Sequence, residues 1–317
     1  MSLHTGETQI QSNRATRPPP PLTLTPHAHP LTFFFVNRLI LNSHFDTVPP
    51  FITFSEDANN IYGRGACDAK GSIVAQLFAV TQMLADGSLD PQDIGLLYVV
   101  EEETTSRGAL ASNELGLTPA YLLVGEPTEL NLAAGHKGGI SFVANSVGKE
   151  SHSGYPELGV SAIDPLVEFL GDLLRQQWPN DTFFGQSTIN IGKINGGVAA
   201  NVVPAAANAS VYIRAAVPVA TIKAQILQVA IPYPNITFTW ISEKDPFRCD
   251  VVPGFQTEVF AYGTDLPSFH SPNHKSYLFG PGSILVAHTD GEYINKTELT
   301  YSIGEYKRLI TAILAQG

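Results

Sequence analysis

The stretch 39–71 constrains the fold of this 317-residue chain more than any other segment. It begins with the apolar run 39–41, typical of a strand buried on both faces, and continues into His44 and Asp46. A second polar loop carries Asp68, directly before a segment whose apolar residues recur at helical spacing. Ligand sites in open α/β sheets lie at the carboxyl ends of strands. An imidazole and carboxylates at such ends predict a metal site.

Composition limits the kind of protein. A hydrophobic content of 44% over this length supports one large or two medium domains with real cores. The formal net charge of -11 argues against a nucleic-acid-binding surface. No apolar run approaches the length of a membrane span. We therefore expect a globular protein that binds neither nucleic acid nor a membrane.

Strand and helix patterns alternate up to about residue 138, as they do in parallel α/β domains. The apolar run 94–100 continues directly into Glu101, Glu102 and Glu103, and the run 121–124 is followed by Glu126. Acidic clusters often form only a solvated face, and that interpretation stays open. Because these acids directly follow buried strands, we expect them to point into a crevice.

The pattern changes between residues 139 and 244. Strand, helix, strand, strand, helix and strand are predicted in that order, which is the order of a ferredoxin-like unit. The sequence then returns with the apolar run 283–287, ends that run on His288, and closes on a helix through 306–313. We expect one α/β domain at 36–138 and 245–317, with a second, α+β domain inserted at 139–244.

The first 35 residues are polar and rich in proline, without hydrophobic periodicity. This composition is typical of disorder or polyproline II, and no apolar segment of a signal peptide follows Met1. Glycosylation sequons occur at Asn180, Asn208, Asn235 and Asn295. The sequons favour secretion and the missing signal segment favours the cytoplasm, so both remain open.

Seven motifs resemble, in order, those of the M20 metallopeptidase family: HFDTVPP, GRGACDAKG, EEETTSRG, GEPT, HSGYPELG, NVVP, and FGPGS followed by AH. The resemblance extends over about residues 36–317 and is strongest to the fungal secreted carboxypeptidases of the family. It implies that 36–138 and 245–317 form a zinc-peptidase α/β catalytic domain. It also implies that 139–244 is a ferredoxin-like α+β lid and dimerisation domain, through which a homodimer forms. It also implies secretion.

The resemblance further implies a site with two Zn²⁺ ions, for which Co²⁺ is a possible substitute. It assigns the metal ligands to His44, Asp68, Glu103, Glu126 and His288, with Asp68 shared between the ions. Imidazole and carboxylate ligands suit zinc, and paired ions can activate water at neutral pH.

Catalytic roles are implied for three further residues. Glu102 is expected to be the general base, and Asp46 to orient the His44 imidazole. His152, in the inserted domain, is expected to stabilise the oxyanion, often across a dimer interface in this family. A polar loop histidine without that role is the alternative for His152.

Substrate contacts are implied for Arg214, Asn201 and Gly282. Arg214 and Asn201 match positions that bind the substrate carboxylate, and Gly282 lies on the loop beside it. The expected reaction is hydrolysis of an amide bond next to a free carboxylate, in a small peptide or an N-acyl amino acid. A metallocarboxypeptidase is favoured over a deacylase of the acetylornithine deacetylase type. A catalytically impaired paralogue is a third interpretation, because family members carry a helix and a strand where this sequence is proline-rich.

Overall fold

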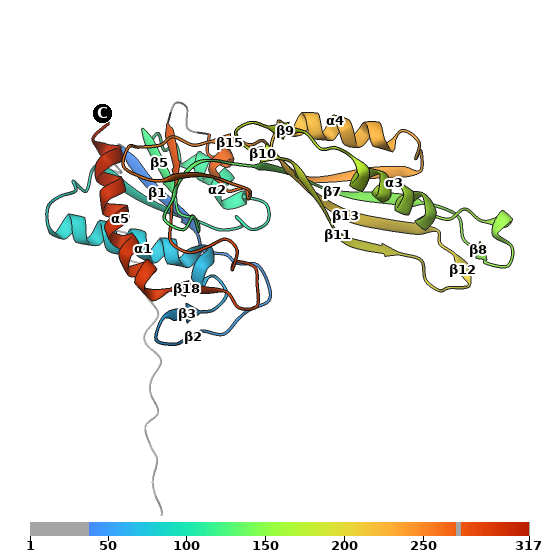
Figure 1. The fold of residues 1–317 in the computed structure, drawn as a ribbon, viewed down its shortest axis with the longest axis horizontal. Coiled ribbons are helices and arrows are strands. Elements are labelled where there is room, and N and C mark those ends of the chain that lie inside the picture. Colours follow the sequence, from blue (N-terminus) through green and yellow to red (C-terminus); the bar gives the residue numbers. More distant parts are fainter. Residues whose placement is uncertain (1–37, 271–273, 317) are drawn as a thin grey trace, which may run out of the picture. The chain divides into compact units, whose positions relative to one another are not determined.

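The computed structural model describes residues 38–270 and 274–316. Its central element is a parallel four-stranded sheet in the order β17-β5-β1-β4 (Figure 1). The strands are β1 (Leu39–His44), β4 (Ile94–Val99), β5 (Tyr121–Val124) and β17 (Lys275–Leu278). β1 lies in the middle of the sheet and all its residues are buried, as the run 39–41 predicts. The predicted α/β class is confirmed.

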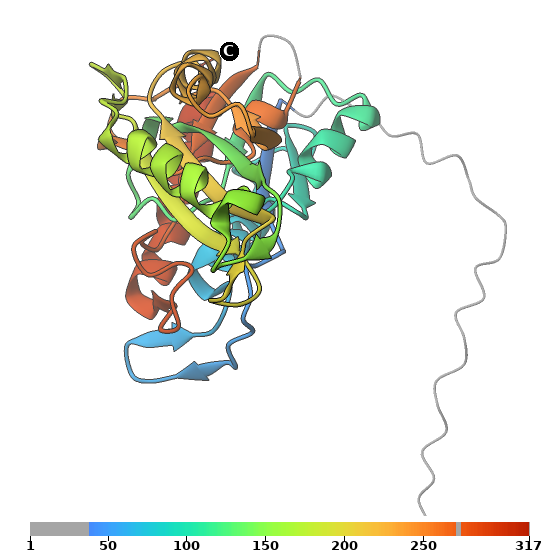
Figure 2. The same cartoon turned by 90° about the vertical axis from the view of Figure 1, so that its right-hand side faces the viewer.

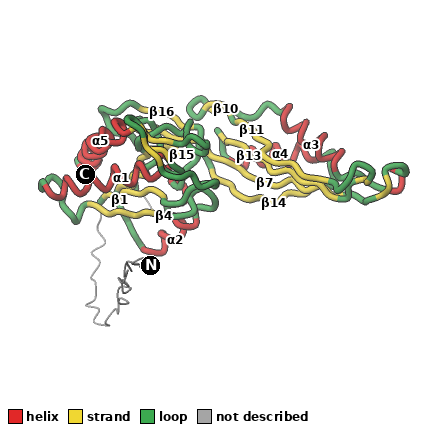
Figure 3. The backbone as a smooth tube through the Cα atoms, turned by 90° about the horizontal axis from the view of Figure 1, so that it is seen from below, coloured by secondary structure: helices red, strands yellow, loops and turns green. Residues whose placement is uncertain are grey.

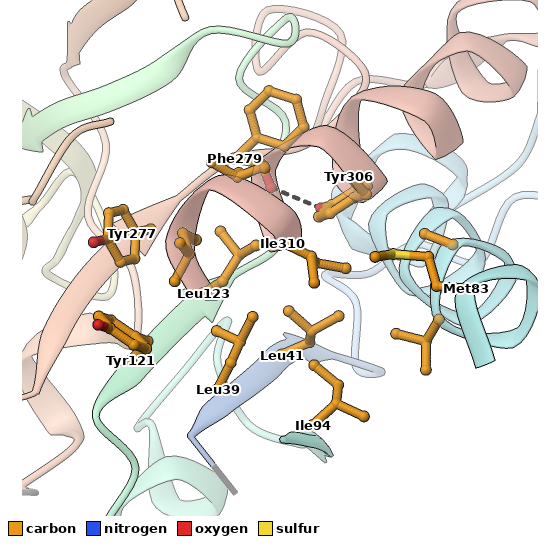
Figure 4. Packing of buried hydrophobic residues seen from close by; sticks show 14 of the residues in the cluster. Leu39, Leu41, Met83, Ile94, Tyr121, Leu123, Tyr277, Phe279, Tyr306 and Ile310 are labelled. Atoms are coloured by element: carbon orange, nitrogen blue, oxygen red, sulfur yellow. Dashed lines mark hydrogen bonds between the residues drawn. The ribbon is translucent and has the colours of Figure 1, made fainter. Parts of the chain in front are cut away.

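Two long helices pack with one face of this sheet around a common hydrophobic core. They are α1 (Gly71–Ala85) and α5 (Lys296–Leu314). Figure 4 shows Leu39 and Leu41 of β1 packed with Met83 of α1 and Ile310 of α5. In the same core, the Tyr306 hydroxyl donates to the carbonyl of Phe279 at 2.7 Å, so its one polar atom is satisfied. The other face of the sheet packs around Ile40, Leu122 and Leu278.

Smaller elements complete this part of the chain. One three-stranded sheet has the order β15-β6-β16, and another has the order β18-β3-β2. Their strands are β2 (Ser55–Glu56), β3 (Asn60–Tyr62), β6 (Leu132–His136), β15 (Phe247–Arg248), β16 (Thr257–Phe260) and β18 (Tyr293–Asn295). The short helix α2 (Arg107–Ser112) follows the loop after β4.

The other four-stranded sheet is antiparallel and has the order β11-β13-β7-β14. Figure 3 shows its strands side by side. Its elements are β7 (Gly138–Val147), α3 (Ile163–Arg175), β11 (Thr188–Gly196), β13 (Ala206–Ala215), α4 (Val219–Ala230) and β14 (Ile236–Lys244). The two helices cover the same face, and Figure 2 shows α3 lying over the sheet. Short strand pairs flank it: β8 (Ser151–His152) with β12 (Val202–Val203), and β9 (Asn180–Asp181) with β10 (Gly185–Gln186). The predicted ferredoxin-like arrangement is confirmed.

The run 283–287 is apolar enough for a strand, but the structure does not form a strand of the parallel sheet there. The last strand of the parallel sheet is β17, and 283–287 forms turns that begin after Gly282 at a φ of 90°. Because β17 already occupies the sheet edge beside β5, the later run is available to line a cavity. The proline-rich segment predicted to be disordered lies outside the described residues. Among those residues, no helix combines the length and the apolar character needed to cross a bilayer.

Candidate metal centre and active site

Three parallel strands deliver the polar residues to one edge of the central sheet. His44 is the last residue of β1, Glu102 and Glu103 lie in the loop after β4, and Glu126 lies two residues after β5. Parallel neighbours end on the same side of a sheet, so side chains far apart in sequence meet there. The strand ends therefore predict the location of this cluster.

The imidazole of His44 lies at the centre of the carboxylates and is almost fully buried. Its Nε2 is 3.0 Å from Oδ1 of Asp68 and 3.7 Å from Oε2 of Glu126. Its Nδ1 lies 3.0 Å from the backbone carbonyl oxygen of Asp46, which accepts a hydrogen bond from the tautomer that carries its proton on Nδ1. Nε2 is then the nitrogen with a free lone pair toward the acidic cluster.

Asp68 lies between the two histidines. Its Oδ1 faces His44, and its Oδ2 is 3.3 Å from Nε2 of His288. Both carboxylate oxygens of Glu103 also approach that nitrogen, at 3.1 Å and 2.9 Å. The structure thus brings together all five predicted ligands, with Asp68 in the position expected of a shared ligand.

The loop that carries Asp68 is fixed by a residue that the motifs did not indicate. Oε1 of Glu292 accepts backbone N–H groups from Gly65, Cys67 and Asp68 at 2.9 Å, 3.1 Å and 3.1 Å. Oε2 of Glu292 pairs with Nη1 of Arg64 at 2.8 Å, and both side chains are buried. Glu292 follows the last motif by four residues but stands 224 positions from Asp68 in sequence, so only the fold reveals its contact with this loop.

Asp46 contacts both His44 and the acidic loop. Its Oδ1 is 3.4 Å from Nδ1 of His44, and its two oxygens accept the backbone N–H groups of Glu102 and Glu103, each at 3.3 Å. Partial burial raises the pKa of Asp46, but the hydrogen bond and charge of His44 and the two N–H groups outweigh it. Its pKa therefore lies below the usual range, and the carboxylate stays ionised while it orients the imidazole.

Glu102 and Glu126 are crowded acids in a desolvated part of the site. Burial, and next the charge of Glu126, raises the pKa of Glu102 well above its ordinary value. Burial likewise raises the pKa of Glu126 to about 7. Ligand atoms of His44, Glu102 and Glu126 lie within 4.8 Å of one another, as do those of His44, Asp68 and Glu103. Such mutual repulsion is what a bound cation relieves.

The acidic cluster opens into a cavity of about 370 Å³, which Asp68, Glu102, Glu103, Glu126 and His288 help to line. The predicted substrate residue Arg214, on β13, lines the same cavity. The cavity is also lined by residues outside the predicted site: His136, Lys137, Tyr212, Lys244 and Tyr262. His136 is buried, its Nδ1 donates to the Lys137 carbonyl at 2.9 Å, and its Nε2 accepts from Thr264 at 3.1 Å.

Other predicted site residues lie elsewhere. His152 is exposed on β8, where its Nδ1 accepts from the N–H of Gly154 at 3.0 Å. Asn201 is beside it, because its carbonyl accepts the N–H of Ser153 at 3.0 Å. Neither lines the cavity of Glu102. Gly282 packs instead against Cys67, whose sulfur a side chain at this glycine would meet.

Comparison with known proteins gives a family model and close relatives. Residues 134–231 match the model described as a peptidase dimerisation domain. A peptidase M20 domain-containing protein of Schizosaccharomyces pombe is 40% identical over 275 residues, which cover 86% of this chain and 68% of that protein. A probable carboxypeptidase of Aspergillus terreus is 38% identical over 310 residues, covering 87% of this chain and 71% of that protein.

Solved structures share the fold at lower identity. A tripeptidase from Staphylococcus aureus has a TM-score of 0.73 at 22% identity, covering 90% of this chain and 83% of its own. An M20 family metallo-carboxypeptidase from Sulfolobus solfataricus has a TM-score of 0.71 at 16% identity, covering 87% and 85%. These likenesses show a common architecture for the two sheets and their helices.

Proposed function

Because the chain belongs to the M20 peptidase family, we propose that it is a metal-dependent carboxypeptidase, which removes the C-terminal residue of a small peptide. The observation that carries the proposal is one cavity lined by Asp68, Glu103 and His288 and also by the cation Arg214. The carboxylates and the imidazole suit metal ions, and a guanidinium suits the free carboxylate of a peptide C-terminus. The relative from Aspergillus terreus, named a probable carboxypeptidase, supports the same assignment.

The residues present fit a pair of divalent cations. Oε1 of the buried Glu126 has no hydrogen-bond partner, and its other oxygen faces Nε2 of His44. A buried carboxylate oxygen without a donor is costly unless a cation or water occupies its free side. We infer that His44 and Glu126 hold one ion and Glu103 and His288 the other, with Asp68 shared. The donor set of imidazole and carboxylate favours Zn²⁺, with Co²⁺ as a substitute.

When bound, the metal ions would supply Lewis acidity, lowering the pKa of water and stabilising negative charge on the substrate oxygen. Glu102 is the proposed general base, because its carboxylate lines the cavity and forms no hydrogen bond or ion pair with another described residue. It would take the proton of the attacking water and return it to the leaving amine. Asp46 orients His44, and Arg214 binds the carboxylate of the departing residue.

A homodimer formed through the inserted domain belongs to this proposal. The match of residues 134–231 to a peptidase dimerisation domain supports it. His152 is exposed on β8 and lies outside its own chain's cavity, which leaves it accessible to a second subunit. We propose that it acts there, with Asn201 beside it.

Secretion with glycosylation remains a proposal that rests on the sequons. The side chains of Asn180 and Asn235 belong to exposed residues. In contrast, the side chain of Asn295 accepts the N–H groups of Thr297 and Glu298 at the start of α5. Asn180 and Asn235 are therefore the better acceptors for an attached glycan. A mass shift on glycosidase treatment of the secreted protein would test this.

The experiment for the activity compares two substrate classes on zinc-loaded protein. Blocked dipeptides such as benzyloxycarbonyl-Gly-Phe report carboxypeptidase activity, and N-acetyl amino acids report deacylase activity. We expect release of the C-terminal amino acid at a higher kcat/KM, loss of activity in chelator, and recovery with Zn²⁺ or Co²⁺. Preference for the N-acetyl substrates would assign a deacylase, and a fully loaded but inactive protein would indicate an impaired paralogue.

A further inference from the structure

The cavity is electrostatically divided, and its basic part contains more charge than one substrate carboxylate needs. Lys137, Arg214 and Lys244 all line it, in a chain whose formal net charge is -11. Arg214 pairs with Gly139 and Ala215 with Gly138 across the β13–β7 register, so Arg214 lies close to the backbone that follows Lys137. A Cβ placed on Gly263 would lie 3.5 Å from the Lys137 carbonyl and 3.9 Å from Nη1 of Arg214.

The three cations differ in how their charge is balanced. Nζ of Lys244 donates to the hydroxyl of Ser106 at 2.5 Å and lies 3.8 Å from the buried carboxylate of Asp265. Within residues 38–270 and 274–316, no carboxylate forms an ion pair with Lys137 or Arg214. Partial burial, and next the charge of Arg214, lowers the pKa of Lys137. Two cations near each other without a counter-ion are unusual in an acidic protein.

Both cations also keep donors free. Lys137 uses one N–H for the carbonyl of Gln186 at 2.6 Å, and an ammonium has three. Arg214 uses Nη1 for the hydroxyl of Tyr212 at 3.2 Å, and a guanidinium has five N–H groups. Its guanidinium carbon lies 4.5 Å from the centre of the Tyr212 ring, which fixes the plane of the fork. The free donors can hold two separate carboxylates.

We propose that the site selects substrates whose departing residue is a dicarboxylate, namely peptides that end in aspartate or glutamate. Arg214 binds the α-carboxylate, as in the proposed function on which this inference rests, and Lys137 binds the side-chain carboxylate. Lys244 does not compete for this role because Asp265 already balances its charge. An uncharged isostere of the same residue leaves Lys137 without its anion.

The test compares benzyloxycarbonyl-Gly-Glu with benzyloxycarbonyl-Gly-Gln on the zinc-loaded protein. A hydrogen bond to a charged group predicts a Glu-to-Gln ratio of kcat/KM of roughly tenfold to a hundredfold. In Lys137→Met that ratio should fall to about one, and Lys137→Arg should retain most of it because the charge remains. Lys149→Met is the matched control: Lys149 is exposed, lies outside the cavity, and should keep the wild-type ratio. Zinc content and circular dichroism verify that each variant is folded.

Two results would overturn the inference: hydrolysis of both substrates at equal kcat/KM by the wild type, or an unchanged ratio in Lys137→Met. Failure of the proposed function is recognised separately by measuring binding of N-acetylglutamate and N-acetylglutamine by calorimetry. If neither peptide is cleaved but N-acetylglutamate binds more tightly and Lys137→Met abolishes the difference, the dicarboxylate site stands without carboxypeptidase activity. Equal binding of both compounds would reject the site as well.

Discussion

The carboxylate of Glu292 is bound on one side by the guanidinium of Arg64, at 2.8 Å, and on the other by the backbone N–H of Asp68, at 3.1 Å. Both charged side chains are buried. The same carboxylate also accepts N–H groups from Gly65 and Cys67, so a residue near the end of the chain fixes the loop that carries the shared ligand. The position of Asp68 therefore depends on this ion pair.

Replacing Glu292 by glutamine should destabilise the protein strongly. The variant leaves the Arg64 charge buried without its partner, and breaking a buried pair typically costs about 3–5 kcal/mol. Glu56→Gln is the control, since Glu56 pairs with Lys296 at 2.7 Å on the surface, where such pairs contribute about 0–1 kcal/mol. Urea unfolding gives both values. Equal losses for the two variants would show that the Arg64 pair does not stabilise the Asp68 loop.

Metal analysis should give close to two equivalents per chain after loading with Zn²⁺ or Co²⁺. His44→Ala and His288→Ala should each weaken a different ion, because the two imidazoles lie on opposite sides of the Asp68 carboxylate. Asp68→Ala should weaken both. Inductively coupled plasma mass spectrometry after dialysis measures the content. Less than about one equivalent after loading would contradict the paired site.

Part of the architecture follows from local pattern. The apolar run 39–41 predicts the buried strand β1, and the helical spacing after Gly71 predicts α1. Because parallel strands end at one edge of a sheet, the acids after the runs 94–100 and 121–124 are predicted to meet His44. These inferences need only short segments and one rule of topology.

Other contacts depend on tertiary packing that no short pattern contains. Glu292 reaches the Asp68 loop across 224 positions of sequence, and Thr264 reaches His136 across 128. The run 283–287 is apolar enough for a strand, but β17 occupies the sheet edge instead. The role of His152 depends on the oligomeric state, since within one chain this residue lies outside the cavity. Sequence patterns report burial and period, whereas these features are set by which distant segments pack together.

The pH dependence of the free energy of unfolding should show the lowered pKa of the buried His136. Burial lowers its pKa from 6.5 to about 4, so the unfolded chain takes up a proton between these values and the folded chain does not. Stability should therefore fall as the pH drops from 6.5 to 4, by about 3 kcal/mol from this group alone. His136→Gln should make the slope shallower in metal-free protein, measured by urea unfolding at several pH values. The exposed His270→Gln is the control, and an unchanged slope in His136→Gln would contradict the prediction.

Subunit complementation should show where His152 acts. His152→Ala and Glu102→Gln should each be nearly inactive, and mixing them after reversible dissociation should restore activity, because a mixed dimer then has one complete site. The control mixture is Glu102→Gln with His44→Ala, which should stay inactive because each change damages the metal site of its own subunit and the mixed dimer has no complete site. Released amino acid is measured over time. No recovery in the first mixture, or a fully active monomer, would show that His152 does not act across subunits.

Glu102→Gln should separate proton transfer from metal binding. The amide keeps the size of the side chain but cannot accept and return a proton, and general acid–base groups contribute typically ~10²–10⁴ in rate. We expect kcat to fall by at least that factor, with KM and zinc content little changed, since Arg214 and the metal ligands remain. Steady-state kinetics and metal analysis on the same preparation measure the three quantities.

Substitutions at Glu101 and Glu103 test whether the general base is Glu102 and not one of its neighbours. Glu103→Gln should lower metal affinity first and rate as a consequence, because both Glu103 oxygens face Nε2 of His288. Glu101→Gln should change neither, because its carboxylate accepts the Thr105 hydroxyl at 2.6 Å and pairs with Arg107 at 3.6 Å, outside the cavity. Since Glu102 lies within ligand distance of His44 and Glu126, loss of a zinc equivalent in Glu102→Gln would make it a ligand rather than the base. If Glu101→Gln inactivated the enzyme and Glu102→Gln had no effect, the roles assigned along the run 101–103 would be wrong by one residue.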